Sequence, residues 1–124
     1  MNERKEFIIQ IKPLKESLKD FAKVWEKLER GEKVKPVRKL TFVDMNVFRT
    51  FATEKRIELL KIIKENKPQS IKELERLTKR DYKSINTDLE VLKKMNLVEI
   101  KKKNHKVIPN VRYKEISIKI PLGV

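Results

Sequence analysis

Apolar residues recur along this chain with two different periods, which divide it into short strands and amphipathic helices. An apolar run of strand length, FIIQI, occupies residues 7–11. Its inward face would hold Phe7, Ile9 and Ile11. Near the other end, residues 115–120 (EISIKI) alternate isoleucine with polar residues, which predicts a half-buried strand with Ile116, Ile118 and Ile120 on its inner face. Whether the two strands pair in one sheet, within a chain or between chains, stays open.

A long helix is predicted to follow the first strand, with Pro13 suiting its first turn and Gly31 ending it. Its apolar residues are spaced as a heptad seam over two repeats. They are Leu14, Leu18, Phe21, Trp25 and Leu28. This face either packs on its own domain or forms a dimer interface. We favour the dimer, because the seam contains a tryptophan and a phenylalanine.

Residues 33–42 (KVKPVRKLTF), which include Pro36, predict a linker that enters a short extended segment. A short helix is expected from Asp44, which is placed to cap it. A further helix then follows Thr53 as N-cap and ends at Lys67–Pro68. We expect it to bury Ile57, Leu60 and Ile63.

A short second helix is predicted at Ser70, because Ser70 and Glu73 have the spacing of a capping box. Its apolar residues are Ile71, Leu74 and Leu77. A third helix, over about residues 81–95, begins at Asp81 as its N-cap, and a β-hairpin with a basic tip follows over about residues 98–108. Three helices with a short middle member, followed by a hairpin, are typical of a winged helix-turn-helix.

The third helix separates an apolar face from a polar one. Taking Ile85 as the buried direction, Leu89 and Leu92 lie on the same side, and the opposite side of the N-terminal half carries hydrogen-bond donors. These outward residues are Arg80, Lys83, Ser84 and Thr87. Such side chains suit the edges of DNA bases. The three acidic residues of this segment are expected to have structural roles. Asp81 caps the helix, Asp88 lies on the flank against the protein, and Glu90 can form an ion pair with Lys94 four residues later.

The predicted DNA-binding set therefore has two parts. The recognition helix and its entrance contribute Lys79, Arg80, Tyr82, Lys83, Ser84, Asn86 and Thr87. The wing and the phosphate contacts contribute Ser70, Lys101, Lys102, Lys103, Asn104, His105 and Lys106. If five or six of these cations meet phosphates, the affinity should fall steeply with salt. The alternative to DNA contact by the wing is a lysine-rich turn that contacts only solvent. For His105 the alternative is an exposed histidine in a turn with no binding role.

The amino-acid composition argues against several classes of function. The 124 residues include no cysteine, one histidine and two glycines, so catalytic dyads, phosphate-binding loops and zinc sites lack their usual parts. We expect no enzyme activity, no metal and no cofactor.

No apolar stretch is long enough to span a membrane and no signal peptide is evident, so we expect a cytoplasmic protein. The net charge of +14 favours a polyanionic partner, although 40% charged residues also suit a thermophile surface.

The expected fold is mainly α with a small β wing (α+β): a winged helix-turn-helix with an N-terminal strand–helix extension and a C-terminal strand. We divide the chain into residues 1–52, an extension for dimerisation with net charge +5 (13 basic against 8 acidic residues), and residues 53–124, the DNA-binding domain with net charge +9 (19 against 10).

Four segments of the chain form a familiar pattern: FAKVWEKLERGEKVKP, KLTF, residues 53–100, and VRYKEISIKIPL. With these segments, most of the chain from Phe21 to Leu122 resembles a group of short archaeal and bacterial winged-helix predicted transcriptional regulators, loosely of the MarR/ArsR type. It implies sequence-specific DNA binding, usually as a dimer, and for some members an antitoxin role. The family's DNA-reading positions correspond to Arg80, Asp81, Tyr82, Lys83 and Asn86. One departure is Asn96, where relatives have glycine; asparagine tolerates a left-handed turn.

The sequence supports three hypotheses about function. The first is a homodimeric regulator that binds double-stranded DNA at specific sequences. The second is an abundant chromatin-type protein that coats DNA with little sequence preference, which the spread of charge favours. The third, compatible with the first, is an antitoxin that also binds a small toxin protein through the N-terminal helix or the C-terminal strand. RNA binding is disfavoured, because most aromatic residues occupy apolar-periodic positions.

Overall fold

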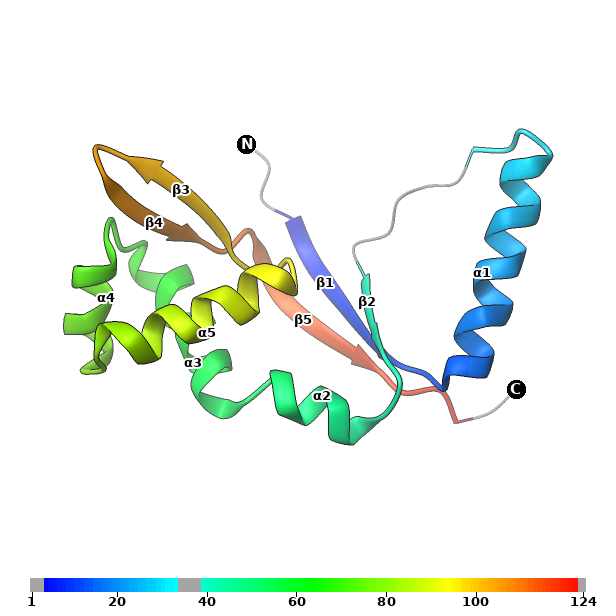
Figure 1. The fold of residues 1–124 in the computed structure, drawn as a ribbon, viewed down its shortest axis with the longest axis horizontal. Helices are drawn as coiled ribbons and strands as arrows, with labels where there is room; N and C mark the ends of the chain where they lie inside the picture. The colour runs from blue at the N-terminus through cyan, green and yellow to red at the C-terminus, as the bar shows by residue number, and fades with distance from the viewer. Residues whose placement is uncertain (1–3, 34–38, 123–124) are drawn as a thin grey trace. The chain divides into compact units, whose positions relative to one another are not determined.

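The computed structural model describes residues 4–33 and 39–122. The fold is α+β, as expected: the described residues form five helices and five strands, and the strands make two small sheets (Figure 1). None of the described helices combines the length and the apolar character that a membrane crossing requires.

The chain forms two compact units. One contains residues 51–114 together with residues 4–5, and the other contains the described residues of 6–50 and 115–122. We expected one division near residue 52, with the C-terminal strand in the second domain. The structure differs at the C-terminus, where the chain returns to the N-terminal unit because β5 (Tyr113–Lys119) is a neighbour of β1 (Arg4–Ile11).

The first sheet has the order β2–β1–β5, with β2 spanning Lys39–Phe42. Strands β1 and β2 are parallel, with Ile9 opposite Leu40 and Ile11 opposite Phe42. The predicted inner face of β1 is confirmed, since Phe7, Ile9 and Ile11 are buried. The open question of strand pairing is also answered: β1 and β5 pair within one chain.

The alternation predicted for the C-terminal strand holds less well. Ile116 is half-buried, but Ile118 and Ile120 are exposed, and β5 ends at Lys119, before Ile120. Strand β5 lies at the edge of its sheet, so its side chains have a neighbouring strand on one side only. The prediction of a buried isoleucine face is therefore wrong for Ile118 and Ile120.

Helix α1 spans Leu14–Glu29 and provides the crossover that two parallel strands require. It stops as predicted at Gly31, which adopts a positive φ of 77°. The Gly31 N–H donates to the Leu28 carbonyl and the Glu32 N–H to the Lys27 carbonyl, both at 3.0 Å, which is a Schellman motif. At its first turns, Lys12 forms an ion pair with Asp20, and this hydrogen bond lowers the pKa of Asp20.

Helix α2 spans Met45–Phe51, and the expected cap is confirmed because Asp44 Oδ1 accepts the Val47 N–H at 2.9 Å. The rings of Phe42 and Phe48 meet edge to face with centroids 5.5 Å apart, which joins β2 to α2. The predicted linker around Pro36 falls largely on residues 34–38, outside the described residues.

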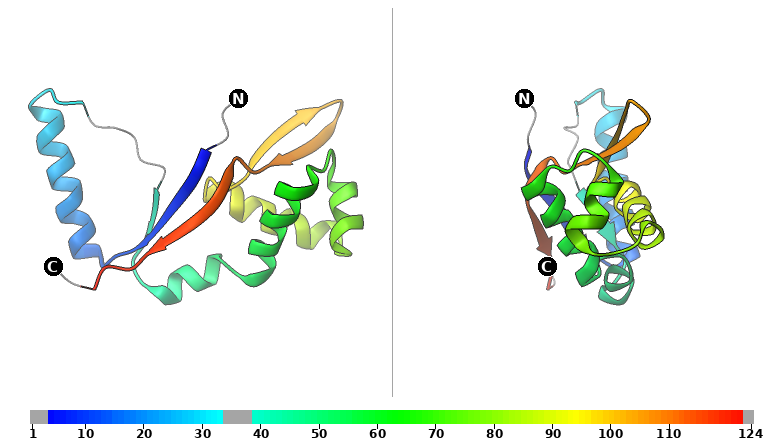
Figure 2. Two further views of the ribbon diagram at one scale, coloured as in Figure 1. Left: turned by 180° about the vertical axis from the view of Figure 1, so that it is seen from behind. Right: turned by 90° about the vertical axis from the view of Figure 1, so that its left-hand side faces the viewer.

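The other unit contains α3 (Glu54–Asn66), α4 (Ile71–Thr78) and α5 (Tyr82–Lys94), and then the antiparallel hairpin of β3 (Glu99–Lys103) and β4 (Lys106–Asn110) (Figure 2). The predicted helix starts are confirmed. Thr53 Oγ1 accepts the Arg56 N–H at 3.3 Å, and Ser70 and Asp81 cap α4 and α5 in the same way.

The core of this unit contains one buried face from each helix. The buried apolar side chains of the three helices are Leu59, Leu60, Ile63, Ile71, Leu74, Ile85, Leu89 and Leu92. Two predictions differ: Ile57 is only half-buried while Leu59 is buried, and Leu77 is 41% exposed. A spacing of three residues turns the side chain by about 60° per step, so Leu77 has rotated away from the direction of Ile71.

Candidate nucleic-acid interface

The turn between α4 and α5 is held by local hydrogen bonds. The Thr78 hydroxyl donates to the Leu74 carbonyl at 2.7 Å and accepts the Arg80 N–H at 3.3 Å. Lys79 adopts a left-handed conformation with φ 56°, which ends α4 and redirects the chain. Asp81 then caps α5, because its Oδ1 accepts the Ser84 N–H at 2.8 Å. The start of α5 is thus set by residues next to each other in the sequence.

The exposed face of α5 carries most of the predicted set. Lys83, Ser84 and Thr87 are exposed, as is Lys79 in the preceding turn, while Asn86 is half-buried. Tyr82 is 55% exposed, so its ring adds a polar-tipped aromatic surface to this face. On the opposite side Ile85, Leu89 and Leu92 are buried, which holds the outward face in one orientation.

Arg80 is oriented differently from the expectation. Its Nη2 lies 2.5 Å from Asp88 Oδ2 and 3.5 Å from the Ser84 carbonyl oxygen, and its side chain is only 21% exposed. On the other side of Asp88, Arg56 Nε donates to Oδ1 at 3.0 Å. Asp88 therefore bridges two arginines, and Arg80 faces α5 itself. A DNA contact by Arg80 remains a prediction, and Nη2 of its guanidinium is already occupied by Asp88 and the Ser84 carbonyl.

This bridge is the main feature that sequence reasoning did not find. Placing Asp88 on the flank against the protein was confirmed, since it is 8% exposed, but its partners were not identified. Arg56 lies 32 residues earlier in the chain and also donates to the Phe51 carbonyl at 3.0 Å. The only available signal was a carboxylate at the edge of an apolar helix face, where a buried charge needs a cationic partner.

The other acids of α5 have local roles. The Ser84 backbone N–H, followed by the Ser84 hydroxyl, lowers the pKa of Asp81, so this carboxylate stays charged at the positive end of the helix dipole. Glu90 accepts a long hydrogen bond of 3.5 Å from Asn86 Nδ2. Apart from the capping Asp81, the exposed N-terminal half of α5 carries no acidic side chain.

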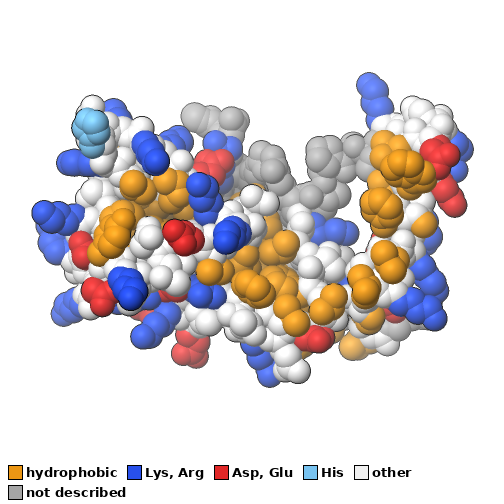
Figure 3. Space-filling model, viewed as in Figure 1, with side chains coloured by type: hydrophobic (Ala, Val, Ile, Leu, Met, Phe, Trp, Pro, Cys, Tyr) orange, Lys and Arg blue, Asp and Glu red, His pale blue; other side chains and the backbone are white. Residues whose placement is uncertain are grey.

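The hairpin is closed by a two-residue turn in which both central residues are left-handed, Asn104 with φ 51° and His105 with φ 64°. This pattern is the type I′ turn, whose twist suits a tight hairpin, and it places Lys103 opposite Lys106. Every residue from 101 to 106 is exposed. The predicted wing residues therefore lie together at one tip, and Figure 3 shows Lys and Arg side chains over the hairpin and around α4 and α5.

The base of the hairpin is tied to its unit. Arg112 Nε lies 2.8 Å from Glu99 Oε2, next to the start of β3. Lys64 Nζ of α3 donates to the Val111 carbonyl at 3.3 Å. These contacts hold the two ends of the hairpin, while the lysine tip stays in solvent.

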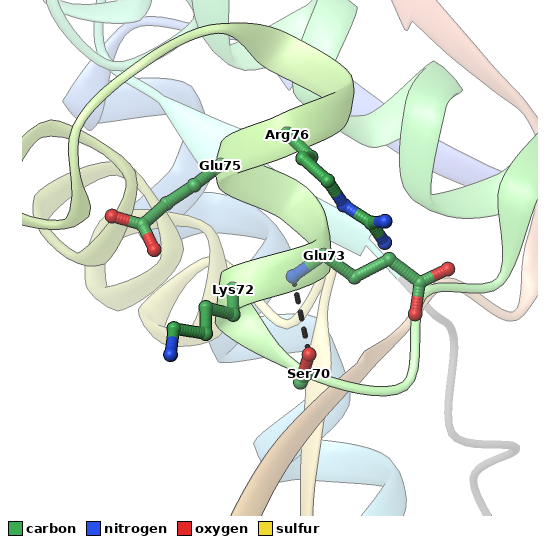
Figure 4. Close-up of a pocket in the computed structure, with 5 residues that line it drawn as sticks. All are labelled: Ser70, Lys72, Glu73, Glu75 and Arg76. Atoms are coloured by element: carbon green, nitrogen blue, oxygen red, sulfur yellow. Dashed lines mark hydrogen bonds between the residues drawn. The ribbon is translucent and has the colours of Figure 1, made fainter.

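Ser70, predicted as a phosphate contact, has a capping role. Its hydroxyl accepts the Glu73 N–H at 3.1 Å, and the Glu73 carboxylate in turn accepts the Gln69 N–H at 3.0 Å, which confirms the predicted Ser70–Glu73 cap with the return bond one residue earlier. Figure 4 shows an open hollow at this start of α4, lined by Ser70, Lys72, Glu73, Glu75 and Arg76. Because two acidic and two basic side chains line this hollow, their charges offset and we expect it to bind a phosphate only weakly.

The predicted dimer residues lie in the other unit. Leu14, Leu18, Phe21, Trp25 and Leu28 are all exposed, and α1 has no buried residue. The alternative in which this face packs on its own domain is therefore not what the structure contains. Among the described residues, no three His, Asp or Glu side chains are grouped so that they could hold a metal ion.

The comparisons with known proteins match this chain to a protein family. No curated protein and no solved structure matches this chain. The model of the HVO_A0114 family matches residues 51–118, a segment that contains α3, α4, α5, the hairpin and most of β5. Since this match covers more than half of the sequence, the chain belongs to the HVO_A0114 family.

Proposed function

We propose that this protein is a transcriptional regulator that binds double-stranded DNA at specific sequences as a homodimer, through a winged helix-turn-helix formed by α3, α4, α5 and the β3–β4 hairpin. In this proposal the protein acts in the cytoplasm as a binding protein, with no catalytic role. Helix α5 enters the major groove and the hairpin lies on the neighbouring backbone.

The face of α5 is the observation that carries the proposal. The buried side chains of α5 fix the helix in its unit, so the opposite face is presented in a single orientation. That face offers Lys83, Ser84 and Thr87 as donors, with Lys79 and Tyr82 beside its first turn. The major groove is about 12 Å wide and admits one α-helix, and side chains of these types recognise base edges there.

Charge supports the same assignment. Residues 53–124 carry a net charge of +9, and the exposed lysines of the hairpin tip concentrate part of it at one place. Phosphate contacts position a protein on DNA, while base contacts give the specificity. In this proposal the basic hairpin tip makes the phosphate contacts and the donors of α5 make the base contacts.

The test is selection of a preferred duplex from random DNA, followed by titration of the selected and scrambled duplexes at several salt concentrations. We expect Lys83→Ala to lower the affinity for the selected duplex roughly tenfold and to reduce the preference over the scrambled one. The control is Lys94→Ala, an exposed lysine at the far end of the same helix, which should change the preference little. Failure to select any sequence would contradict specific recognition.

The chromatin-type alternative is favoured by the net charge of +14 on 124 residues. It predicts equal affinity for all duplexes at moderate salt and equal losses for Lys83→Ala and Lys94→Ala, because only phosphates would be contacted. The same titration therefore separates the two functions. An additional toxin partner would appear as a second protein that co-purifies from the native host.

A further inference from the structure

The apolar seam of α1 has no partner within the described residues. Its five members are Leu14, Leu18, Phe21, Trp25 and Leu28, called here the α1 seam, and they are between 53% and 64% exposed. Figure 3 shows hydrophobic side chains gathered along this helix. The rings of Phe21 and Trp25 stack on each other at 6.4 Å, so two aromatic residues stand side by side in solvent. A patch of this kind marks an interaction surface.

We propose that the α1 seam binds the α1 seam of a second copy of this chain, with the two helices antiparallel about a two-fold axis. The inference rests on the homodimer in the proposed function and names the surface and the arrangement of the two helices. It does not depend on DNA binding, because the helix belongs to the unit that lacks α5 and the hairpin.

Charge complementarity indicates the antiparallel arrangement. In the heptad register of the seam, Lys15 and Glu29 both occupy position e, on the same flank, and both are exposed. They are 14 residues apart in the sequence, about 21 Å along the helix, so they cannot pair within one chain. An antiparallel neighbour brings Lys15 of one copy beside Glu29 of the other, twice by symmetry. In a parallel pair, position e meets position g, where no opposite charge is present.

The same register also orders the apolar layers. With the two-fold axis near residue 23, Phe21 of each copy meets Trp25 of the other, and Leu18 meets Leu28. The flanking positions at the centre hold Ala22 and Val24, which leave room for close approach. The largest rings thus lie at the middle of the contact and the charges at its two ends, which is the usual anatomy of a protein interface.

The buried area is sufficient for a specific contact. Each half-exposed seam residue presents on the order of 100 Å². Two copies of the seam with Val24 thus offer about 1,200 Å² for burial, which is of the order of the roughly 1,000 Å² expected of a specific interface. The helix has only two heptads, so we expect a dimer whose population depends on protein concentration.

The first experiment measures self-association of the full chain without DNA. Sedimentation equilibrium should show a monomer–dimer equilibrium, and the emission of Trp25, the only tryptophan, should shift to the blue as the concentration rises. Leu18→Glu should remove both changes, while Lys23→Glu, on the outer face of α1, should keep them. Far-UV circular dichroism and urea unfolding verify that Leu18→Glu is folded.

A charge exchange tests the direction of the helices. Lys15→Glu alone and Glu29→Lys alone should each weaken the dimer roughly tenfold, because two like-charge pairs replace two opposite-charge pairs. The double variant K15E/E29K should restore the dimer. Single variants without effect would overturn the antiparallel arrangement.

A chemical cross-link gives an independent result. The chain contains no cysteine, so Ala22→Cys introduces a unique thiol at the centre of the contact. A short bismaleimide should link this variant into dimers, whereas Lys23→Cys should stay largely unlinked. A chain that is monomeric at every concentration, or a dimer that survives Leu18→Glu, would overturn the proposal. A dimer that binds no specific DNA would leave it standing and contradict only the DNA-binding proposal.

Discussion

Asp88 is the only charged side chain buried among the described residues. It accepts from Arg56 of α3 and from Arg80 at the entrance to α5, at 3.0 and 2.5 Å. A buried carboxylate is costly unless cations neutralise it, and here each guanidinium also loses part of its hydration. The position of Asp88 thereby couples α3 to the start of α5, the part of the molecule that we propose for DNA recognition.

Replacing this carboxylate tests the coupling. We expect Asp88→Asn to lower the free energy of unfolding by about 2 kcal/mol, less than the ~3–5 kcal/mol of a fully buried pair, because both arginine side chains keep some exposure. Urea unfolding followed by circular dichroism measures the change. Glu90→Gln, on the exposed face of the same helix, is the control and should stay within about 0.5 kcal/mol of the parent. Equal losses for both variants would contradict the role of Asp88.

Asp81 gives a prediction about pH. Its hydrogen bonds to Ser84 lower its pKa in the folded state below the ordinary value of 3.8. A lowered folded-state pKa means that the carboxylate stabilises the protein above pH 3.8 and that this contribution disappears as the pH falls through the folded pKa. The unfolding midpoint of Asp81→Ala should therefore lie below that of the parent at pH 7, and the two should converge on acidification. A constant difference down to pH 2 would be inconsistent with capping by the ionised carboxylate.

At the scale of elements, the structure confirms the predicted caps of α3, α4 and α5, because caps depend on neighbours in the sequence; Pro13, expected in the first turn of α1, instead lies directly before it as the N-cap. Thr53, Ser70 and Asp81 each accept the N–H of the third residue after them, as their spacing predicts. The turn after α5 also behaves as expected for Asn96. It has φ 63°, and the Leu97 N–H donates to the Leu92 carbonyl at 3.0 Å, so asparagine replaces the usual glycine in this cap.

The hairpin tip gives an element-level prediction about salt. If the three lysines of β3 each neutralise a phosphate, replacing Lys101, Lys102 and Lys103 by alanine should reduce the slope of log affinity against log salt by about 2–3. Filter-binding or anisotropy titrations measure this slope. The matched control replaces Lys19, Lys23 and Lys33, three exposed lysines of the other unit, and should leave it nearly unchanged. Equal effects would indicate a general charge effect instead of a wing contact.

At the scale of the whole molecule, the two proposals combine into one prediction. A dimer carries two copies of α5, and binding of the second half-site becomes intramolecular once the first is bound. Leu18→Glu should therefore lower the affinity for a complete selected duplex at least tenfold and leave the affinity for a single half-site unchanged. Anisotropy titrations with the two duplexes measure both values. A loss for the half-site as well would indicate damage to the DNA-binding unit.

Local chemistry made much of the fold predictable. Helix caps, the heptad spacing of α1, the stop at Gly31 and the hairpin all follow from residues a few positions apart, and the structure contains them. The exposed donors of α5 followed from its apolar period in the same way, because burying Ile85 and Leu89 turns Lys83 and Thr87 outward. The candidate site was therefore largely visible in the sequence.

Contacts between distant residues were decided by the tertiary structure alone. Arg80 turns toward Asp88 because folding brings Arg56 and Asp88, 32 residues apart, within 3.0 Å and buries the carboxylate between two guanidinium groups. Strand β5 pairs with β1, across nearly the whole chain, and its place at the sheet edge leaves Ile118 exposed despite its regular alternation. Periodicity determines which face of an element is apolar. The partner of that face depends on which distant segments meet in the folded chain, and the sequence pattern does not contain that information.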